Sequence, residues 1–365
     1  MDSTTLRQDS QTLLSELGLD SLSDVVLLAL QCVRSGNYQQ ALDLCRAGSE
    51  KFGGDAAVKV VSAMAELGLG HAANAQSLLS NVYEERPQHL VGLYTSAWMH
   101  AELGNRAGAI EDLLRVTRTF PDYPGALGML SSLLMPGPSY REVLSYIHLA
   151  LRPTSYLEIG VETGATLRLA QTAKHIVGVD PNLASLRRDE LSPQTQLYAV
   201  TSDEFFETQT LSKVFGGQPL QLAFIDGMHR FEFALRDFCN VELWSNPQTV
   251  VVVHDVLPIL PIVAERERQT KFWVGDVWKA LWLLAELRKD LTVTVIPTPP
   301  SGLAVFRGLN RAHRHDSVQW SRAIERYAGL SCPIEEPGIW PSQLRVTENT
   351  KRGWHDALGI SENSS

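Results

Sequence analysis

The sequence is short of cysteine, of basic charge and of long apolar runs, and each shortage argues against a class of protein. Its four cysteines, Cys32, Cys45, Cys239 and Cys332, have no C-x-x-C spacing, so neither a zinc site nor a disulfide framework is expected. No apolar run reaches the roughly 18 residues of a membrane span, so no membrane association is expected. The net charge of −9 argues against a nucleic-acid partner, because phosphate backbones are bound by clustered Lys and Arg.

The remaining composition is that of an ordinary globular protein. Of 365 residues, 44% are hydrophobic and 20% are charged, and this length is sufficient for two domains. Residues 1–11, MDSTTLRQDSQ, are polar and lack the basic flank and apolar core of a secretory signal, so a cytoplasmic protein is expected. The charged run at 265–271, ERERQTK, mixes both signs.

Small residues recur with a period of 34 in the N-terminal third. The series are Gly36, Gly70 and Gly104; Ala29, Ala63 and Ala97; Ala41, Ala75 and Ala109; and Pro87 and Pro121. This pattern resembles the tetratricopeptide repeat, in which two antiparallel helices pack through small residues and a proline ends the unit. Apolar residues at helical spacing predict helices over 25–33, 56–67 and 93–103, each followed by a short turn.

Such an array suits two roles, which the sequence leaves open. One is a homo-oligomer contact or packing module, and the other is a concave surface that recruits a protein or peptide partner. The repeats are expected to occupy a domain over 1–135. The segment 134–140, LMPGPSY, is a connector by composition. A second domain over 136–308 and a C-terminal extension over 309–365 are expected to follow.

The second domain centres on residues 156–170, YLEIGVETGATLRLA. The apolar run and the spaced glycines predict a strand, a tight turn and a helix. A further strand ends at Asp180, 22 residues after Glu158, the interval at which an acid meets ribose hydroxyls. The carboxylates of Glu158 and Glu162 would repel a pyrophosphate, so a cofactor with a cationic centre is expected. The predicted cofactor residues at this turn are Glu158, Gly160, Glu162, Thr163 and Gly164.

Five motifs follow one another along this part of the chain: LEIGVETG, VGVD, LAFIDGMHRFEFALRDF, VVVVHDV and FWVGDVWKALWLL. Together they resemble the class I S-adenosylmethionine-dependent methyltransferases, and in particular the branch that methylates hydroxyls of sugars and small natural products. The resemblance covers residues 140–308. It implies an α/β Rossmann-like domain with a seven-stranded sheet and helices on both faces, here preceded by the all-α repeats. It also implies S-adenosylmethionine as cofactor and a small-molecule substrate.

Two later strands end on polar residues. The strand over 220–226 delivers Asp226 and is followed by His229, and the strand over 250–255 delivers His254 and Asp255. Because ligands bind outside the carboxyl ends of strands in such sheets, these four side chains are expected to converge, with Asp226 also bordering the cofactor. Carboxylate oxygens suit Mg²⁺, which lowers the pKa of a bound hydroxyl. The resemblance implies that Asp226 binds the ion and that His229 removes the hydroxyl proton.

The sequence leaves open whether this site binds a metal. The relatives carry two acidic or amide residues where this chain has His254 and Asp255, and imidazole is a poorer ligand for Mg²⁺ than carboxylate. Either Asp226 and Asp255 hold the ion, with His254 as the third predicted metal residue, or the site works without metal. Structural roles compete as well. Asp226 could cap the helix near Arg230, and a backbone carbonyl could satisfy His254.

The third strand, over 196–200, leads to Ser202 and Asp203, which are expected near the adenine, although Asp203 could instead cap a helix. Glu162 and Thr163 could likewise be helix caps.

The segment 257–274 is placed to act as a substrate lid. Strands over 291–296 and 302–306 predict a reversed final strand. In the extension, a helix over 318–330 is expected, with His313, His315 and His355 on the surface.

The predicted reaction is transfer of a methyl group from S-adenosylmethionine to a substrate hydroxyl in one in-line displacement, with His229 as general base. Three alternatives remain open. The same pocket could methylate an amino group, the repeats could recruit a protein or peptide to be methylated, or the chain could be a non-catalytic interaction protein.

Overall fold

The computed structural model describes residues 12–85, 89–314, 317–334 and 336–360. The polar segment 1–11, Pro87 and His315 lie outside them. The chain forms two compact units, Met1–Leu130 and Ser131–Ser365. The division lies within helix α8 (Ala126–Leu134), a few residues before the connector expected from composition.

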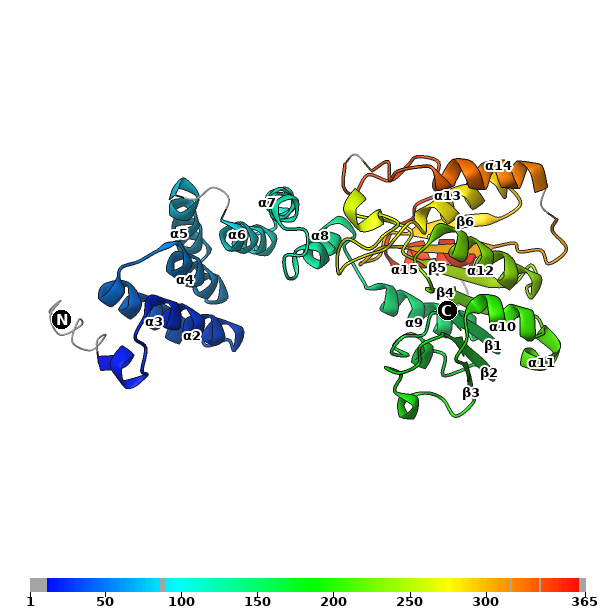
Figure 1. Cartoon of the computed structure of the whole chain (residues 1–365), viewed down its shortest axis with the longest axis horizontal. Helices are drawn as coiled ribbons and strands as arrows, with labels where there is room; N and C mark the ends of the chain where they lie inside the picture. Colours follow the sequence, from blue (N-terminus) through cyan, green and yellow to red (C-terminus); the bar gives the residue numbers. More distant parts are fainter. Residues whose placement is uncertain (1–11, 86–88, 315–316, 335, 361–365) are drawn as a thin grey trace. The chain divides into compact units, whose positions relative to one another are not determined.

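The N-terminal unit is built from helices that pack in consecutive pairs (Figure 1). They are α2 (Leu22–Arg34), α3 (Tyr38–Phe52), α4 (Ala56–Gly68), α5 (Ala72–Glu85), α6 (Leu90–Glu102) and α7 (Arg106–Thr119). The three helices predicted from apolar spacing are confirmed as α2, α4 and α6, and α3, α5 and α7 follow the predicted turns.

The period of 34 has a physical basis in this unit. Gly36, Gly70 and Gly104 have φ angles of 77°, 82° and 73°, a backbone region that L side chains rarely adopt. Each is the middle residue of the turn between two helices. The six alanines of the two alanine series are all completely buried. Small side chains therefore stand where the helices approach one another most closely.

The C-terminal unit contains one seven-stranded sheet with the strand order β3-β2-β1-β4-β5-β7-β6. The strands are β1 (Ser155–Ile159), β2 (His175–Val179), β3 (Thr195–Tyr198), β4 (Leu222–Ile225), β5 (Val250–His254), β6 (Thr292–Ile296) and β7 (Leu303–Arg307). Strands β1 to β5 are parallel, and β7 is antiparallel to both β5 and β6. The predicted α/β fold class and the reversed final strand are confirmed.

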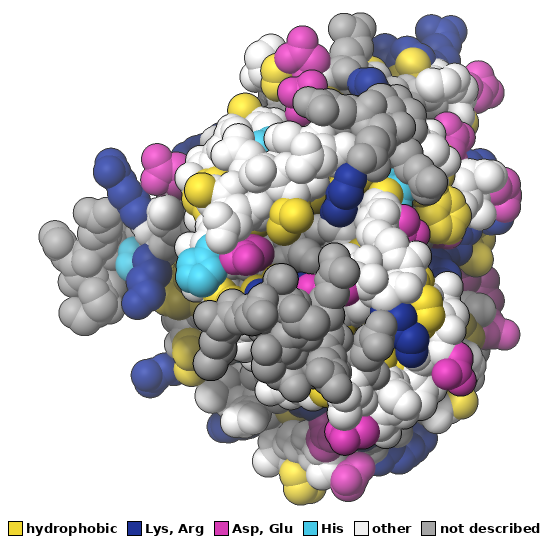
Figure 2. All heavy atoms as spheres, turned by 90° about the vertical axis from the view of Figure 1, so that its left-hand side faces the viewer, with side chains coloured by type: hydrophobic (Ala, Val, Ile, Leu, Met, Phe, Trp, Pro, Cys, Tyr) yellow, Lys and Arg dark blue, Asp and Glu magenta, His cyan; other side chains and the backbone are white. Residues whose placement is uncertain are grey.

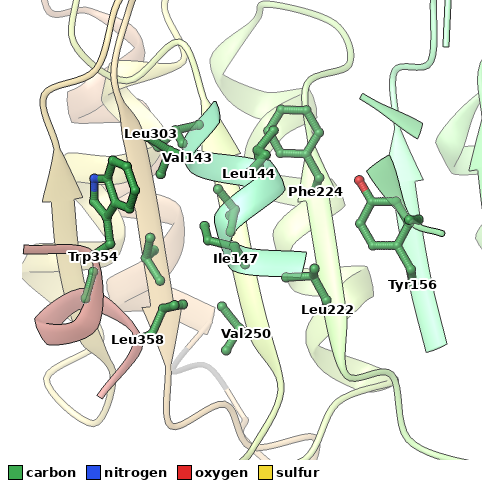
Figure 3. Packing of buried hydrophobic residues seen from close by; sticks show 14 of the residues in the cluster. Val143, Leu144, Ile147, Tyr156, Leu222, Phe224, Val250, Leu303, Trp354 and Leu358 are labelled. Atoms are coloured by element: carbon green, nitrogen blue, oxygen red, sulfur yellow. The ribbon is translucent and has the colours of Figure 1, made fainter. Parts of the chain in front are cut away.

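Helices cover both faces of the sheet. On one face, α9 (Tyr140–Leu151) and α15 (Lys351–Leu358) pack on the strands, with Ile147 and Leu144 against Leu222 and Phe224 (Figure 3). Alternate strand residues point to the other face, where α12 (Phe231–Leu243) and α13 (Trp278–Leu287) lie and the ring centroids of Phe238 and Phe306 are 4.8 Å apart.

Apart from the 12-residue helix α14, the remaining elements are short. They are α10 (Ser202–Thr208), α11 (Leu211–Phe215), α14 (Ser317–Ala328) and the 3₁₀ turns η1 (Leu167–Leu169), η2 (Arg188–Glu190) and η3 (Pro261–Ala264). The helix α14 confirms the one predicted over 318–330. The α-helix predicted after the glycine turn is wrong, because only η1 forms there. The short stretch before β2 must contain the turn and the return to the start of the sheet, whereas a helical crossover usually needs more chain.

The C-terminal extension belongs to the core of its unit. Trp354 and Leu358 of α15 join the hydrophobic cluster over the sheet (Figure 3). Nearby, the backbone of Arg345 and Thr347 forms hydrogen bonds with Val295 of β6. The expectation of a surface position is wrong for His355, which is half-buried and forms a hydrogen bond with Tyr146.

Neither unit has a membrane-spanning element in its described part, because none of the helices there is both long and apolar enough to cross a bilayer. Among the described residues visible in Figure 2, acidic and basic side chains are interspersed with apolar and neutral ones and form no continuous patch of one sign.

Candidate active site

A cavity of about 750 Å³ lies in the C-terminal unit, at the carboxyl ends of the parallel strands. Its volume falls in the range of small-molecule sites. Ten of the residues predicted from the sequence line it: Gly160, Glu162, Thr163, Asp180, Ser202, Asp203, Asp226, His229, His254 and Asp255. The structure therefore brings together residues from the ends of all five parallel strands.

Two predicted cofactor residues, Glu158 and Gly164, do not line the cavity. Glu158 is completely buried in β1, and its carboxyl group accepts hydrogen bonds from Tyr156 at 2.6 Å and Thr166 at 2.8 Å. Burial raises the pKa of Glu158 to about 8, although these two donors oppose the shift. Gly164 has a φ of 78°, and a Cβ there would lie 2.6 Å from Leu186. Both residues support the turn without contacting the cavity.

The turn after β1 is held by the acid that ends β2. Oδ2 of Asp180 accepts hydrogen bonds from the backbone N–H groups of Val161 and Glu162, both at 2.9 Å, and Oδ1 accepts one from Asn182 at 2.7 Å. Glu162 has a φ of 49°, which is rare for a residue with a side chain. Asp180 thus fixes the backbone of the turn while facing the same cavity.

The helix-cap alternatives for the cofactor residues are wrong. Thr201 is the N-cap of α10 and forms a capping box with Glu204, whereas the carboxylate of Asp203 forms a bidentate ion pair with Arg236 at 2.7 and 3.0 Å. Glu162 and Thr163 do not cap an α-helix, because none follows their turn.

The candidate catalytic cluster consists of Asp226, His229 and Asp255, whose ligand atoms all lie within 4.8 Å of one another. Nε2 of His229 is 3.0 Å from Oδ2 of Asp255 and 3.6 Å from Oδ1 of Asp226. Asp226 does not cap α12, since the backbone N–H of Phe231 donates to Asp276 at 2.7 Å instead. The side chain of Asp226 is therefore directed to the cluster.

The segment WVGD holds His229 in place. Nδ1 of His229 is 3.0 Å from the carbonyl oxygen of Trp273, and the two rings stack with their centroids 5.3 Å apart. Only glycine fits at position 275, because a Cβ on Gly275 would lie 1.8 Å from the carbonyl oxygen of His229. The carboxylate of Asp276 accepts a hydrogen bond from the backbone N–H of Phe231. In the sequence, this motif was noted only because it resembles a motif of the methyltransferase family. In the structure, residues 273–276 hold His229 and the start of α12 in place.

Charge sets the protonation of His229. Burial lowers the pKa of His229, but the neighbouring Asp255 and Asp226 carboxylates outweigh burial and raise this pKa to about 9. Burial also opposes ionisation of Asp226, yet the nearby His254 and His229 hold the pKa of Asp226 well below its usual range. The two carboxylates therefore favour the protonated form of His229.

His254 lies beneath the cluster. Its Nδ1 is 3.3 Å from Oδ1 of Asp226 and 3.4 Å from Oδ1 of Asp255, and its Nε2 is 3.3 Å from Oγ of Ser301. Burial opposes its protonation, but Asp255 and Asp226 raise the pKa of His254 well above its usual value. Both ring nitrogens of His254 lie near side-chain oxygens, so the alternative of a backbone carbonyl partner is wrong. The role of His254 as a metal ligand stays a prediction.

The donor set fits a hard divalent cation. Asp226 and Asp255 offer carboxylate oxygens, the ligands that Mg²⁺ prefers. Oδ2 of Asp255 is buried and has no hydrogen-bond partner among the described residues, although His229 lies within ion-pair distance of it. Asp255 also has a φ of 60°, a strained conformation that is typical of functional sites.

Comparison with known proteins finds a family that is similar to part of this unit. Residues 157–256 match a family described as a methyltransferase domain. No curated protein matches the chain. This segment begins in β1 and ends just after β5, so it contains the glycine turn and all three residues of the candidate catalytic cluster.

Several solved structures match about half of this chain. Cofactor-bound Rv0187 from MTB has 17% sequence identity and a TM-score of 0.39 over 55% of this chain and 97% of that one. The O-methyltransferase from Bacillus cereus in complex with SAH has 13% identity and a TM-score of 0.37 over 54% and 89%. The O-methyltransferase TomG from Streptomyces achromogenes, involved in tomaymycin synthesis and in complex with SAM, has 18% identity and a TM-score of 0.37 over 54% and 88%. The family match covers residues 157–256 of the C-terminal unit, a little over a quarter of the 365-residue chain.

Proposed function

We propose that this protein is an S-adenosylmethionine-dependent methyltransferase that acts on a hydroxyl of a sugar or another small natural product. The observation that carries the proposal is the position of Asp226, His229 and Asp255, which share one cavity with the turn at Gly160. The methyltransferase domain match over 157–256 supports it.

We assign the cofactor to the side of the cavity formed by the ends of β1, β2 and β3. Gly160 lines this side of the cavity, and its lack of a side chain lets the turn pack against the backbone of Asp226. The carboxylate of Glu162 suits the positive charge of a sulfonium or ammonium group. Asp180 keeps acceptor capacity for ribose hydroxyls beside the three N–H groups that it binds. Ser202 and Asp203 border the expected adenine position.

We assign proton removal to His229. In the reaction, the acceptor oxygen bonds to the methyl carbon, the carbon–sulfur bond of the cofactor breaks, and the hydroxyl proton passes to Nε2 of His229. The bond to the Trp273 carbonyl directs Nε2 toward the strand ends. Asp226 and Asp255 would hold a divalent ion, which would lower the pKa of a bound hydroxyl and offset the negative charge that keeps His229 protonated.

The test is calorimetric titration of the full chain with S-adenosylmethionine, with and without Mg²⁺. Saturable heat with the cofactor is expected, followed by methyl transfer when hydroxylated acceptors are added. No heat in either condition contradicts the proposal. If an amine were methylated and a hydroxyl were not, the proposed cofactor would stand and the proposed acceptor group would be wrong.

For the N-terminal unit, we propose a tetratricopeptide-like array that mediates a homo-oligomer contact or binds a protein partner. The period of 34 and its buried alanines support this role. Light scattering of the full chain over a range of concentrations tests the homo-oligomer. A constant monomer mass contradicts it and leaves recruitment of another protein as the role to test by affinity capture.

A further inference from the structure

Charged side chains separate by sign across the cavity. Those that follow β1, β2 and β3, on one half of the sheet, are acidic: Glu162, Asp180 and Asp203. Apart from Asp226 and Asp255 of the candidate catalytic cluster, those on the other side follow β4 and β5 or begin α9, and are cationic: Arg141, Arg230, Arg268 and Lys271. The candidate catalytic cluster stands between them at the ends of β4 and β5. The two sides of the cavity therefore suit ligands of opposite charge.

Contacts within the protein already satisfy much of the acidic side. Three backbone N–H groups bind the carboxylate of Asp180, and Arg236 forms a bidentate ion pair with Asp203. The cofactor proposed for this side carries its own positive charge. The acidic side therefore does not call for a cationic substrate.

The cationic side is less neutralised. The guanidinium of Arg141 lies over the ring of Tyr140, and that of Arg268 donates to the backbone carbonyl oxygens of Thr270 and Lys271. In the described parts of the chain, neither Arg141 nor Arg268 forms an ion pair with a carboxylate. These contacts leave the positive charge of both side chains uncompensated.

Arg230 does have an acidic partner. It pairs with Glu267 at 3.0 Å, but the Glu267 side chain is 70% exposed, so solvent screens this ion pair. Apolar surface from Phe233 and Trp273 lines the cavity beside these cations. The space next to the catalytic cluster thus combines apolar walls with a cationic rim.

We infer that the methyl acceptor is a small hydroxylated molecule with an oxyanion group, a carboxylate or a phosphate, which Arg141 and Arg268 bind. This inference rests on the proposed function and narrows its substrate class. Guanidinium groups bind carboxylate and phosphate through paired N–H donors, and a cationic rim raises the local concentration of anions. Bound in this way, the acceptor would present its hydroxyl to His229.

The experiment compares acceptors that differ only in the oxyanion group. One pair is 3,4-dihydroxybenzoate and 3,4-dihydroxybenzamide, and the other is glucose 6-phosphate and glucose. Binding to the full chain saturated with S-adenosylhomocysteine is measured by calorimetry at constant ionic strength. The charged member of at least one pair is expected to bind about tenfold more tightly or better, because hydrogen bonds to charged groups are strong. The pair that responds distinguishes carboxylate from phosphate.

Substitutions then locate the effect. Arg141→Gln and Arg268→Gln are each expected to weaken binding of the charged probe about tenfold while leaving the neutral probe unchanged. Arg268→Lys keeps a positive charge and should restore part of the loss. Arg322→Gln, on the exposed side of α14, is the matched control and should change nothing.

The possible failures are distinguishable. If the charged member of neither pair binds more tightly, or if no charged probe binds, the inference is wrong even when S-adenosylhomocysteine binds normally. If both Gln variants keep the full preference, the oxyanion is bound elsewhere and the inference is also wrong. Failure of S-adenosylhomocysteine to bind contradicts the proposed function instead.

Discussion

Gly160 and Asp226 lie so close together that a Cβ atom on Gly160 would be 1.9 Å from the carbonyl oxygen of Asp226. The turns after β1 and β4 therefore touch through their backbones, and Asp226 N–H also donates to Ile159 at 2.8 Å. This contact ties the proposed cofactor turn to the first residue of the catalytic cluster.

The first prediction follows from this contact. Gly160→Ala adds a methyl group that the backbone of Asp226 must move to accept, and it also forces Ala to a φ of 88°. We expect the free energy of unfolding to fall by more than about 3 kcal/mol. Denaturant titration followed by tryptophan fluorescence measures it.

The matched control is Gly217→Ala. Gly217 has a similar φ of 79°, but nothing lies within 4 Å of its added Cβ. Only backbone strain of roughly 1–2 kcal/mol is expected there. If the two variants lost equal stability, the close contact at Gly160 would have no energetic importance.

The second prediction concerns the proposed base. His229→Ala should lower kcat about 10²–10⁴-fold, because proton transfer by a positioned group contributes that much. The affinity for S-adenosylmethionine should stay nearly unchanged. Single-turnover assays and calorimetry measure the two effects, with His71→Ala in the N-terminal unit as control. A His229→Ala enzyme with normal turnover would falsify the assignment.

The third prediction concerns the divalent ion. Mn²⁺ binding, observed by electron paramagnetic resonance of the full chain, should weaken more than about tenfold in Asp226→Asn and Asp255→Asn, because each loses a charged ligand. Asp203→Asn removes a cavity carboxylate outside the cluster and should bind Mn²⁺ like the wild type. Equal binding by all four proteins would place the ion elsewhere.

The fourth prediction uses the buried Glu158. Its folded pKa of about 8 lies above its ordinary value of 4.5, so the folded state holds the proton more tightly than the unfolded chain. This contribution to stability is fully present below pH 4.5 and is lost as the pH rises to about 8.

Replacing Glu158 by Gln removes this titration. Relative to wild type, Glu158→Gln should therefore become more stable between pH 4.5 and 8, by on the order of a few kcal/mol at the upper end. Urea unfolding across this pH range measures the difference. Glu325→Gln makes the same substitution at an exposed position of α14 and serves as the control.

The strands could be predicted from the sequence for a clear reason. A parallel strand buried on both faces reads as a continuous apolar run, and in β4 and β5 the run ends directly before Asp226 and at His254. Because the carboxyl ends of parallel strands meet at one edge of the sheet, the four polar residues there could be predicted to converge. The burial of Glu158 could not be predicted, because it depends on hydrogen bonds that Tyr156 and Thr166 donate to its carboxyl group.

Side-chain partners were the part that sequence could not supply. Asp203 was predicted near the adenine, which stays a prediction, or as a helix cap, which is wrong. Its ion pair with Arg236 on another helix could not be predicted from the sequence. His254 was predicted as a metal ligand, and the sequence did not show that its Nδ1 lies within 3.3 and 3.4 Å of the carboxylates of Asp226 and Asp255. Such partners lie far apart in the chain, and no local pattern encodes them.

The last prediction tests the packing of the repeats. Ala75 of α5 is completely buried, and interiors are packed too densely to accept a larger side chain without strain. Ala75→Leu should therefore destabilise the N-terminal unit by about 1–3 kcal/mol. Ala73→Leu, two residues earlier on the exposed side of the same helix, should have little effect. Hydrogen exchange in α4 and α5 reports on this unit alone, and exchange at the wild-type rate in Ala75→Leu would mean that the period of 34 does not mark close helix contacts.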